Sequence, residues 1–159
     1  MPTISRFLAN PAETTRLGAA IGGYLRPGDV VGLSGPLGAG KTALARGVIG
    51  EFAGAKEVPS PTYGLVESYV GKRCALWHFD LYRLEKPEDV FELGFDDALA
   101  EGASLIEWPE RIANLLPPDL ILIRLQIAGA GRSVRIDGDR GWIPSLGPLA
   151  ARAESSQGS

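Results

Sequence analysis

A second cysteine is absent from this sequence of 159 residues, in which Cys74 stands alone. An intrachain disulfide and a thiolate metal cluster both need several cysteines, so the composition excludes them and fits a reducing compartment. Also missing are a run of about 18 apolar residues that could span a bilayer and the long apolar core of a signal peptide near the N-terminus. We therefore expect a cytoplasmic protein with no membrane association.

The sequence also lacks a large net charge of either sign. The chain has 16 Lys and Arg against 19 Asp and Glu, a formal net charge of −3. Proteins that bind nucleic acid on their own neutralise phosphates with a basic surface, so we do not expect direct RNA binding, although a partner protein could bring the chain to RNA. Apolar residues make up 45% of the sequence, and a chain of this length can bury one core. We expect a single domain over residues 1–150 and a disordered polar tail over 151–159.

The glycine-rich stretch 35–42, Gly-Pro-Leu-Gly-Ala-Gly-Lys-Thr, matches the pattern of a phosphate-binding loop, or P-loop. It lies between an apolar run at 29–34, which predicts a buried strand, and residues 42–49, which predict a helix. Glycines let backbone N–H groups approach phosphate oxygens, and the helix N-terminus adds partial positive charge. Lys41 would contact the β- and γ-phosphates, and the Thr42 hydroxyl would bind Mg²⁺. Because the Asn-Lys-x-Asp signature of guanine selection is absent, we favour ATP as the nucleotide.

The rest of the chain alternates helical and strand patterns, as expected of an α/β protein. The helix after the P-loop should end near Phe52, because Gly54 can stop it. A strand reached through helices is normally parallel to the earlier strand, so we expect the run at 104–109 to lie parallel to the P-loop strand. The other expected elements are helices at 13–25, 85–93, 96–101 and 111–116, strands at 65–70, 74–82 and 120–127, and a hairpin partner at 132–136.

Two acidic residues follow apolar strand runs. Glu107 would open at the same end of the sheet as the P-loop, where a carboxylate can bind Mg²⁺. Asp80 emerges from the run at 74–82 and is our candidate for positioning the attacking water or for coupling the nucleotide to a conformational switch. The alternatives are a solvent-exposed strand-end acid for Glu107 and a turn-forming or arginine-paired acid for Asp80, with Arg83 as the partner.

Three further features leave two interpretations open. His78 shares a strand face with Asp80, because side chains alternate along a strand, and a hydrogen-bonded structural histidine is favoured over a catalytic one. The segment 58–63, Val-Pro-Ser-Pro-Thr-Tyr, predicts a loop that is either a linker or a switch whose hydroxyls, including that of Thr62, sense the γ-phosphate or its metal. Trp108 can be explained by packing alone.

Four short segments carry a joint pattern. They are Leu-Gly-Ala-Gly-Lys-Thr at 37–42, Ser-Pro-Thr-Tyr at 60–63, His-Phe-Asp-Leu-Tyr-Arg-Leu at 78–84 and Ile-Glu-Trp-Pro at 106–109. Together they resemble the bacterial TsaE (YjeE-like) family, the P-loop ATPases of tRNA threonylcarbamoyladenosine biosynthesis. The resemblance extends over residues 14–136, and chance agreement of all four segments in order is not credible.

The resemblance implies a P-loop NTPase-like three-layer fold with a central mixed sheet flanked by helices. It also implies binding of ATP and Mg²⁺ and a weak ATPase activity that depends on the TsaD and TsaB proteins, with tRNA contacted only indirectly. The metal would be held by Thr42 and Glu107, and hydrolysis would depend on Lys41 and Asp80. The positions implied to contact the nucleotide are Thr14, Gly38, Ala39, Gly40, Lys41, Thr42, Ala43, Thr62 and Arg132.

Two residues depart from the family pattern. Pro36 stands where the family usually has Asp, and proline removes a backbone N–H and fixes the φ angle. Because the later half of the loop forms most of the phosphate cradle, we expect nucleotide binding to survive. Ala43 stands where the family commonly has a hydroxyl residue, so one contact to the α-phosphate would be missing.

Two other classes of function remain alternatives. A small-molecule kinase would also use a P-loop, but the expected lid and a cluster of acceptor-binding arginines are hard to find in 159 residues. A nucleotide-dependent binding module with negligible turnover would use ATP only to order the segment 58–64. Phosphate release, substrate phosphorylation and binding without release distinguish the three.

Overall fold

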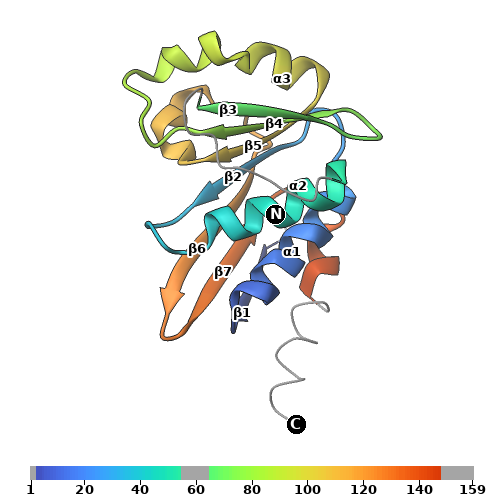
Figure 1. Ribbon diagram of the computed structural model, residues 1–159, viewed down its shortest axis with the longest axis vertical. Helices are drawn as coiled ribbons and strands as arrows, with labels where there is room; N and C mark the ends of the chain where they lie inside the picture. Colours follow the sequence, from blue (N-terminus) through green and yellow to red (C-terminus); the bar gives the residue numbers. More distant parts are fainter. Residues whose placement is uncertain (1–2, 55–64, 148–159) are drawn as a thin grey trace.

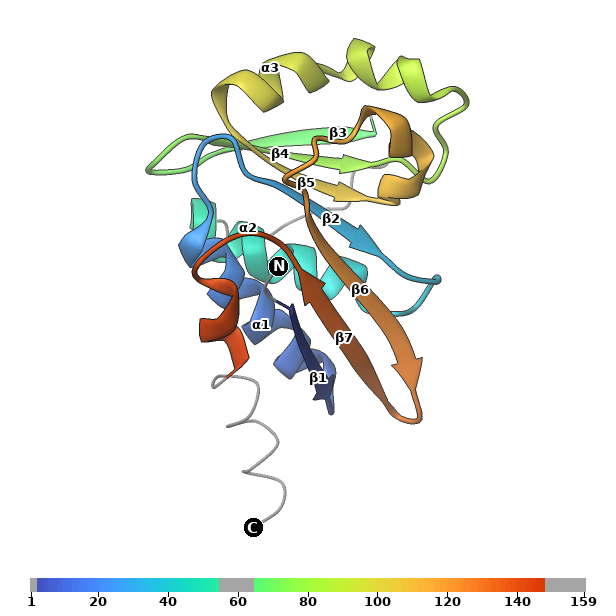
Figure 2. The same cartoon turned by 180° about the vertical axis from the view of Figure 1, so that it is seen from behind.

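The computed structural model describes residues 3–54 and 65–147. This part of the chain forms a seven-stranded sheet in the order β1-β7-β6-β2-β5-β4-β3, with helices on both faces (Figures 1 and 2). None of its helices is long and apolar enough to cross a membrane. The strands are β1 (Thr3–Leu8), β2 (Val30–Ser34), β3 (Val66–Val70), β4 (Ala75–Asp80), β5 (Ala103–Glu107), β6 (Ile121–Ala128) and β7 (Gly131–Asp137). The α-helices are α1 (Pro11–Tyr24), α2 (Lys41–Ala53) and α3 (Phe95–Glu101), and the 3₁₀ helices are η1 (Pro87–Leu93), η2 (Pro109–Leu115) and η3 (Ile143–Ser145).

The sheet is mixed, as predicted. β6, β2, β5 and β4 are parallel to one another, whereas β3, β7 and β1 each lie antiparallel to their neighbours. The strand predicted at 104–109 is β5, and it is parallel to β2. Glu107 at the end of β5 is in register with Leu33 of β2 and with Asp80 of β4. The carboxyl ends of these three strands therefore meet where the chain leaves β2 for the P-loop.

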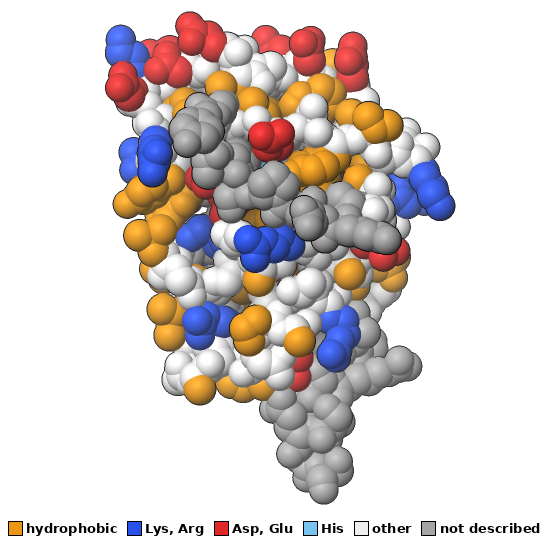
Figure 3. Space-filling view, in the orientation of Figure 1, with side chains coloured by type: hydrophobic (Ala, Val, Ile, Leu, Met, Phe, Trp, Pro, Cys, Tyr) orange, Lys and Arg blue, Asp and Glu red, His pale blue; other side chains and the backbone are white. Residues whose placement is uncertain are grey.

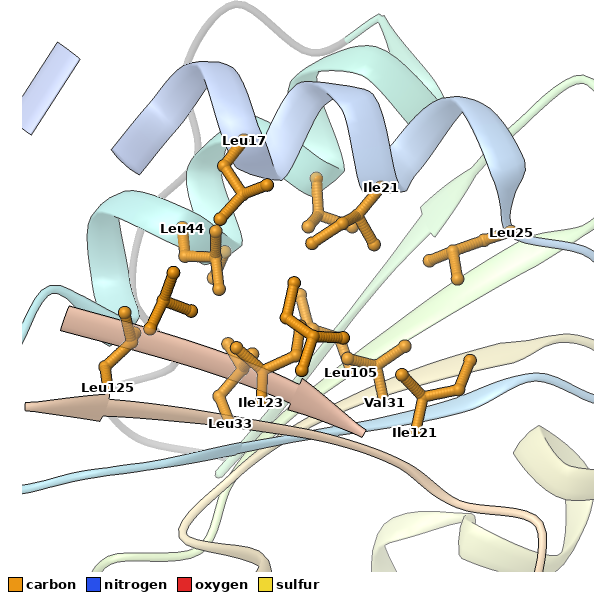
Figure 4. Close-up of a cluster of buried hydrophobic side chains, with 14 of the residues drawn as sticks. Leu17, Ile21, Leu25, Val31, Leu33, Leu44, Leu105, Ile121, Ile123 and Leu125 are labelled. Atoms are coloured by element: carbon orange, nitrogen blue, oxygen red, sulfur yellow. The ribbon is translucent and has the colours of Figure 1, made fainter. Parts of the chain in front are cut away.

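Successive side chains of the central strands point to opposite faces of the sheet, and each face has its own apolar core. Val31 and Leu105 pack with α1 and α2, whereas their neighbours Val30 and Ile106 pack with η1, α3 and η2 on the other face. Figure 4 shows the first core, in which apolar side chains of α1 and α2 face those of β2, β5 and β6. The fold is therefore three-layered, with the sheet between helices, which confirms the predicted α/β architecture.

Glycines bring α1 and α2 into direct backbone contact. A Cβ atom added to Gly18 of α1 would lie 2.2 Å from the carbonyl oxygen of Leu44 in α2. A Cβ atom added to Gly47 of α2 would lie 2.1 Å from the carbonyl oxygen of Thr15 in α1. Real Cβ atoms do not approach so closely, so both positions require glycine. This contact holds the N-terminal half of α1 against the helix that follows the P-loop.

Helix α1 begins at Pro11, two residues before the predicted start. The Asn10 side chain accepts a hydrogen bond from the N–H of Glu13 at 2.9 Å, and Glu13 in return accepts one from the N–H of Ala9 at 2.6 Å. This reciprocal arrangement resembles a capping box, except that Glu13 accepts from Ala9, the residue before the N-cap Asn10. Pro11 suits the first helical position because it has no N–H to leave unpaired. The start of α1 was therefore predicted two residues too late, because Asn10 and Pro11 are the residues that signal it.

Strands β1, β4 and β5 also differ from expectation. Strand β5 ends at Glu107, two residues before the predicted end at position 109. Strand β1 at Thr3–Leu8 was not predicted, although it pairs along its full length with β7. Strand β4 ends at Asp80, whereas the sequence pattern extended it to Tyr82. The reason is local: the Asp80 side chain accepts a hydrogen bond from the N–H of Tyr82 at 3.2 Å, which turns the chain away from the sheet.

Candidate functional site

The P-loop connects β2 to α2 through residues 35–40. Gly35, Gly38 and Gly40 have φ angles of 149°, 80° and 102°, a region that side chains rarely adopt. A Cβ on Gly35 would also lie 2.4 Å from the carbonyl oxygen of Leu125. Gly40 caps α2 without a side-chain hydrogen bond, so the first N–H groups of that helix keep their donor capacity. The result is a backbone cradle that suits a phosphate group.

Lys41 carries a buried positive charge beside this cradle. The residue is only 5% exposed, and its Nζ donates hydrogen bonds to the carbonyl oxygens of Gly35 and, at 3.0 Å, Pro36. The same Nζ lies 4.0 Å from the centroid of the Trp108 ring. Burial lowers the pKa of Lys41, and the nearby carboxylates, led by that of Glu107, partly offset this effect. The ammonium is thus held at the loop by carbonyl dipoles and an aromatic face.

Asp80 and Glu107 occupy paired positions at the ends of β4 and β5, so their side chains project from the same face of the sheet. Burial raises the pKa of Asp80, and the hydrogen bond from the Tyr82 N–H lowers it in part. Glu107 is 3% exposed, and its Oε2 lies 2.7 Å from Nε2 of His78. The two carboxylates differ accordingly: Asp80 is half-buried and hydrogen-bonded to a backbone N–H, whereas Glu107 is enclosed and hydrogen-bonded to a buried histidine.

These groups line one cavity of about 310 Å³. It brings together Lys41 and Thr42 at the start of α2 with Asp80 and Glu107 at the strand ends. The cradle, the ammonium, the hydroxyl and the carboxylates therefore converge, as the sequence analysis expected. The full lining consists of Leu37, Gly38, Gly40, Lys41, Thr42, Asp80, Tyr82, Glu107 and Trp108.

The remaining candidate residues lie around the loop. A Cβ added to Gly40 would lie 3.5 Å from the Thr14 side chain of α1, and Arg132 at the start of β7 donates from Nε to the carbonyl oxygen of Gly38 at 3.1 Å. Ala39 is buried within the loop and Ala43 lies in the first turn of α2. Thr62, with the whole segment 58–63, lies outside the described residues.

Two site residues were not identified from the sequence. Trp108, interpreted there as packing, covers Lys41 and has a left-handed backbone with φ 62° and ψ 52°. Such a conformation is uncommon for a residue other than glycine and is found at functional sites. The Tyr82 ring lies 4.9 Å from the Trp108 ring, centroid to centroid. Its position in the sequence could have identified Trp108 as a site residue, because it directly follows Glu107 at a strand end and precedes a proline.

The donor set fits Mg²⁺ bound together with a nucleotide. The described residues contain no group of three or more His, Cys, Asp or Glu side chains arranged to enclose a metal ion. Mg²⁺ does not need one, because it keeps several waters and is usually held by one or two carboxylates together with phosphate oxygens. Thr42 and Glu107 supply oxygen ligands of the required kind within the cavity.

The sequence matches one protein family over most of its length. The family of "Threonylcarbamoyl adenosine biosynthesis protein TsaE" matches residues 8–135. The curated tRNA threonylcarbamoyladenosine biosynthesis protein TsaE of Rickettsia felis is 43% identical over 121 residues, which is 76% of this chain and 71% of the relative. The protein of the same name from Bacillus subtilis is 34% identical over 121 residues, covering 76% and 75% of the two chains.

A solved structure has the same fold. The crystal structure of Bacillus subtilis YdiB superposes with a TM-score of 0.73 at 25% identity, covering 96% of this chain and 97% of that one. Sequence and fold comparisons therefore agree, and the P-loop, the β4–β5 strand ends and Arg132 all lie within the matched residues. The chain belongs to the TsaE family.

Proposed function

We propose that this protein binds Mg²⁺ and ATP and hydrolyses ATP as a subunit required for threonylcarbamoyladenosine modification of tRNA. The names of its relatives support the pathway. The observation that carries the ATPase assignment is the convergence of Lys41 and Thr42 with Asp80 and Glu107 in one cavity. A P-loop supplies phosphate binding, and the carboxylates supply the additional groups that hydrolysis needs.

Each residue has a distinct task in binding. The N–H groups at the start of α2 and the Lys41 ammonium bind phosphate oxygens, for which Lys41 exchanges its present carbonyl partners. Thr42 and Glu107 would hold Mg²⁺, which would supply positive charge to neutralise the phosphates of the nucleotide. Thr14 and Arg132 flank the loop and contact the nucleotide from α1 and β7, and Thr62 is assigned to the same set from the family resemblance.

Asp80 orients the attacking water in the hydrolytic step. Its carboxylate lines the cavity and is not part of the buried His78–Glu107 pair. Burial raises its pKa, and a carboxylate with a raised pKa accepts a proton more readily than an ordinary aspartate. The position and the basicity of Asp80 therefore both suit a water-positioning role.

The composition of the cavity supports the proposal that turnover is weak without partners. Among the described residues that line it, Lys41 is the one cation. Phosphoryl transfer develops charge that many P-loop ATPases neutralise with an additional arginine, supplied by the chain itself or by a partner. We propose that assembly with TsaD and TsaB completes the site, and that this complex, rather than the chain alone, acts on tRNA in the cytoplasm.

The surface charge supports indirect contact with tRNA. Figure 3 shows acidic side chains gathered along the end of the molecule formed by η1 and α3. An acidic surface repels the phosphate backbone of RNA, which favours protein partners as the contact to tRNA. The exposed acids of this segment are Glu85, Glu88, Glu92, Asp96, Asp97 and Glu101.

Phosphate release measured with purified components tests the proposal. We expect slow release by the chain alone and faster release when TsaD and TsaB are added, with Lys41→Ala as the inactive control. Phosphorylation of a small molecule in place of phosphate release would support a kinase. Nucleotide binding without release in either condition would support a binding module, and absence of nucleotide binding would overturn the assignment.

A further inference from the structure

His78 is enclosed beneath the candidate metal ligand. Its side chain is 2% exposed, and Nε2 lies 2.7 Å from Oε2 of Glu107. A carboxylate can only accept a hydrogen bond, so the shared proton is donated by Nε2 of His78. His78 lies two residues before Asp80 on β4 and on the same face of the strand. The imidazole therefore contacts Glu107 from the neighbouring strand, on the buried side of the carboxylate.

The contact constrains one oxygen of Glu107. The hydrogen bond from His78 occupies Oε2, and it is the one hydrogen bond that the described residues make to this carboxylate. Nδ1 of His78 has no hydrogen-bond partner among the described residues either, so the imidazole makes this one polar contact there. The side chain of Glu107 also lines the cavity that contains Thr42. The arrangement leaves one carboxylate oxygen for a ligand while the other is fixed.

We propose that His78 is a positioning residue that orients the Glu107 carboxylate for Mg²⁺. This inference rests on the proposed function, since it assigns a role within the same metal site. A glutamate has three rotatable side-chain bonds, and a hydrogen bond to one oxygen removes much of that freedom before the metal arrives. Groups that hold metal ligands in this way typically change metal affinity by about 10- to 100-fold when they are removed.

A purely structural role makes a different prediction. The pair could simply join β4 to β5, but these strands are already in register at five positions, from Leu76–Ala103 to Asp80–Glu107. Loss of a strand-joining contact would lower the unfolding temperature and would affect nucleotide binding with and without metal alike. Loss of a positioning contact weakens metal binding and leaves metal-free nucleotide binding unchanged. The phosphates are bound by the P-loop between β2 and α2, and His78 on β4 is not part of that loop.

Two substitutions of similar size separate these roles. His78→Gln keeps a donor nitrogen near the Nε2 position, whereas His78→Met fills similar space without a donor. We titrate Mn²⁺, a spectroscopic substitute for Mg²⁺, into ADP-saturated protein and follow free Mn²⁺ by electron paramagnetic resonance. We expect about a 10- to 100-fold weaker Mn²⁺ affinity in His78→Met and an affinity close to wild type in His78→Gln. ADP affinity without metal should be equal in all three proteins.

The outcomes distinguish this inference from the proposed function. Wild-type Mn²⁺ affinity in a folded His78→Met protein would overturn the positioning role while leaving the ATPase assignment intact. Failure of the wild-type protein to bind ADP or Mn²⁺ would instead overturn the proposed function. If His78→Met does not fold, His78→Asn provides the test, because its shorter amide does not reach Glu107. Metal affinity equal to wild type in His78→Asn would likewise contradict the role.

Discussion

The Lys41 ammonium lies 4.0 Å from the centroid of the Trp108 ring. It is held there by hydrogen bonds to the carbonyl oxygens of Gly35 and Pro36. Carbonyl dipoles and a ring face replace part of the water that a buried ammonium loses. The proline at position 36 removes a donor from the loop but keeps the carbonyl that Lys41 uses. The proline therefore leaves the contact between the loop and Lys41 in place.

Removal of the Lys41 ammonium should greatly weaken nucleotide binding. Hydrogen bonds to charged groups contribute about 1.5–3 kcal/mol each, so Lys41→Ala should weaken binding of ADP with Mg²⁺ by about 100-fold or more. Isothermal titration calorimetry provides the measurement. Lys72→Ala is the matched control, because Lys72 is exposed in the turn between β3 and β4 and should bind like wild type. Equal affinities in Lys41→Ala and wild type would contradict the assigned role.

Substitution of Asp80 should separate turnover from binding. Asp80→Ala removes the water-positioning carboxylate but leaves the P-loop, Lys41 and Thr42 in place. We expect ATP affinity close to wild type and a rate of phosphate release about 10²- to 10⁴-fold lower, as is typical for loss of a general base. Single-turnover kinetics in the presence of the partner proteins measures the rate. The division of roles is wrong if Asp80→Ala and Lys41→Ala lose ATP affinity to the same extent.

The sequence predicted those parts of the site that depend on local pattern. The P-loop was identified because its glycines, lysine and threonine occur at fixed spacing between a strand and a helix. The parallel orientation of β5 and β2 followed from the helical connection between them, because parallel strands need a crossover and antiparallel ones do not. The position of Glu107 at the same end of the sheet as the P-loop then followed from strand direction, whereas the pairing of Asp80 with Glu107 is known only from the structure.

Contacts between distant segments could not be predicted. The His78–Glu107 bond depends on the register of β4 against β5, which the sequence does not specify. The position of Trp108 over Lys41 depends on a left-handed turn after β5, and no residue type signals it reliably. Strand β1 was missed because only Leu8 among its residues is buried, so its apolar alternation is weak.

Glycine at position 47 is required by the contact between α1 and α2. A Cβ there would lie 2.1 Å from the carbonyl oxygen of Thr15, so Gly47→Ala forces the two helix backbones apart. Overpacking of this kind costs about 1–3 kcal/mol of unfolding free energy. Denaturant unfolding followed by circular dichroism measures the loss.

A second glycine in the same helix pair is the matched control. A Cβ on Gly23 of α1 would have the Glu51 Cγ, at 4.0 Å, as its nearest neighbour. Alanine there restricts the unfolded chain without a clash, so Gly23→Ala should stabilise the protein by up to about 1 kcal/mol. A change of stability in the same direction in Gly47→Ala and Gly23→Ala would contradict a backbone contact between α1 and α2 at Gly47.

The pKa of Asp80 links stability to pH with a defined sign. Burial raises this pKa above the ordinary value of 3.8, so the folded state binds the proton more tightly than the unfolded state. The ionised carboxylate therefore destabilises the fold above the folded-state pKa, and this cost disappears as pH falls towards the unfolded-state value. Asp80→Asn should raise the unfolding temperature at about pH 7, and the gain should shrink towards about pH 4. Thermal unfolding across this range measures it, with exposed Glu85→Gln as the control; a gain that grew with acidification would contradict the burial of Asp80.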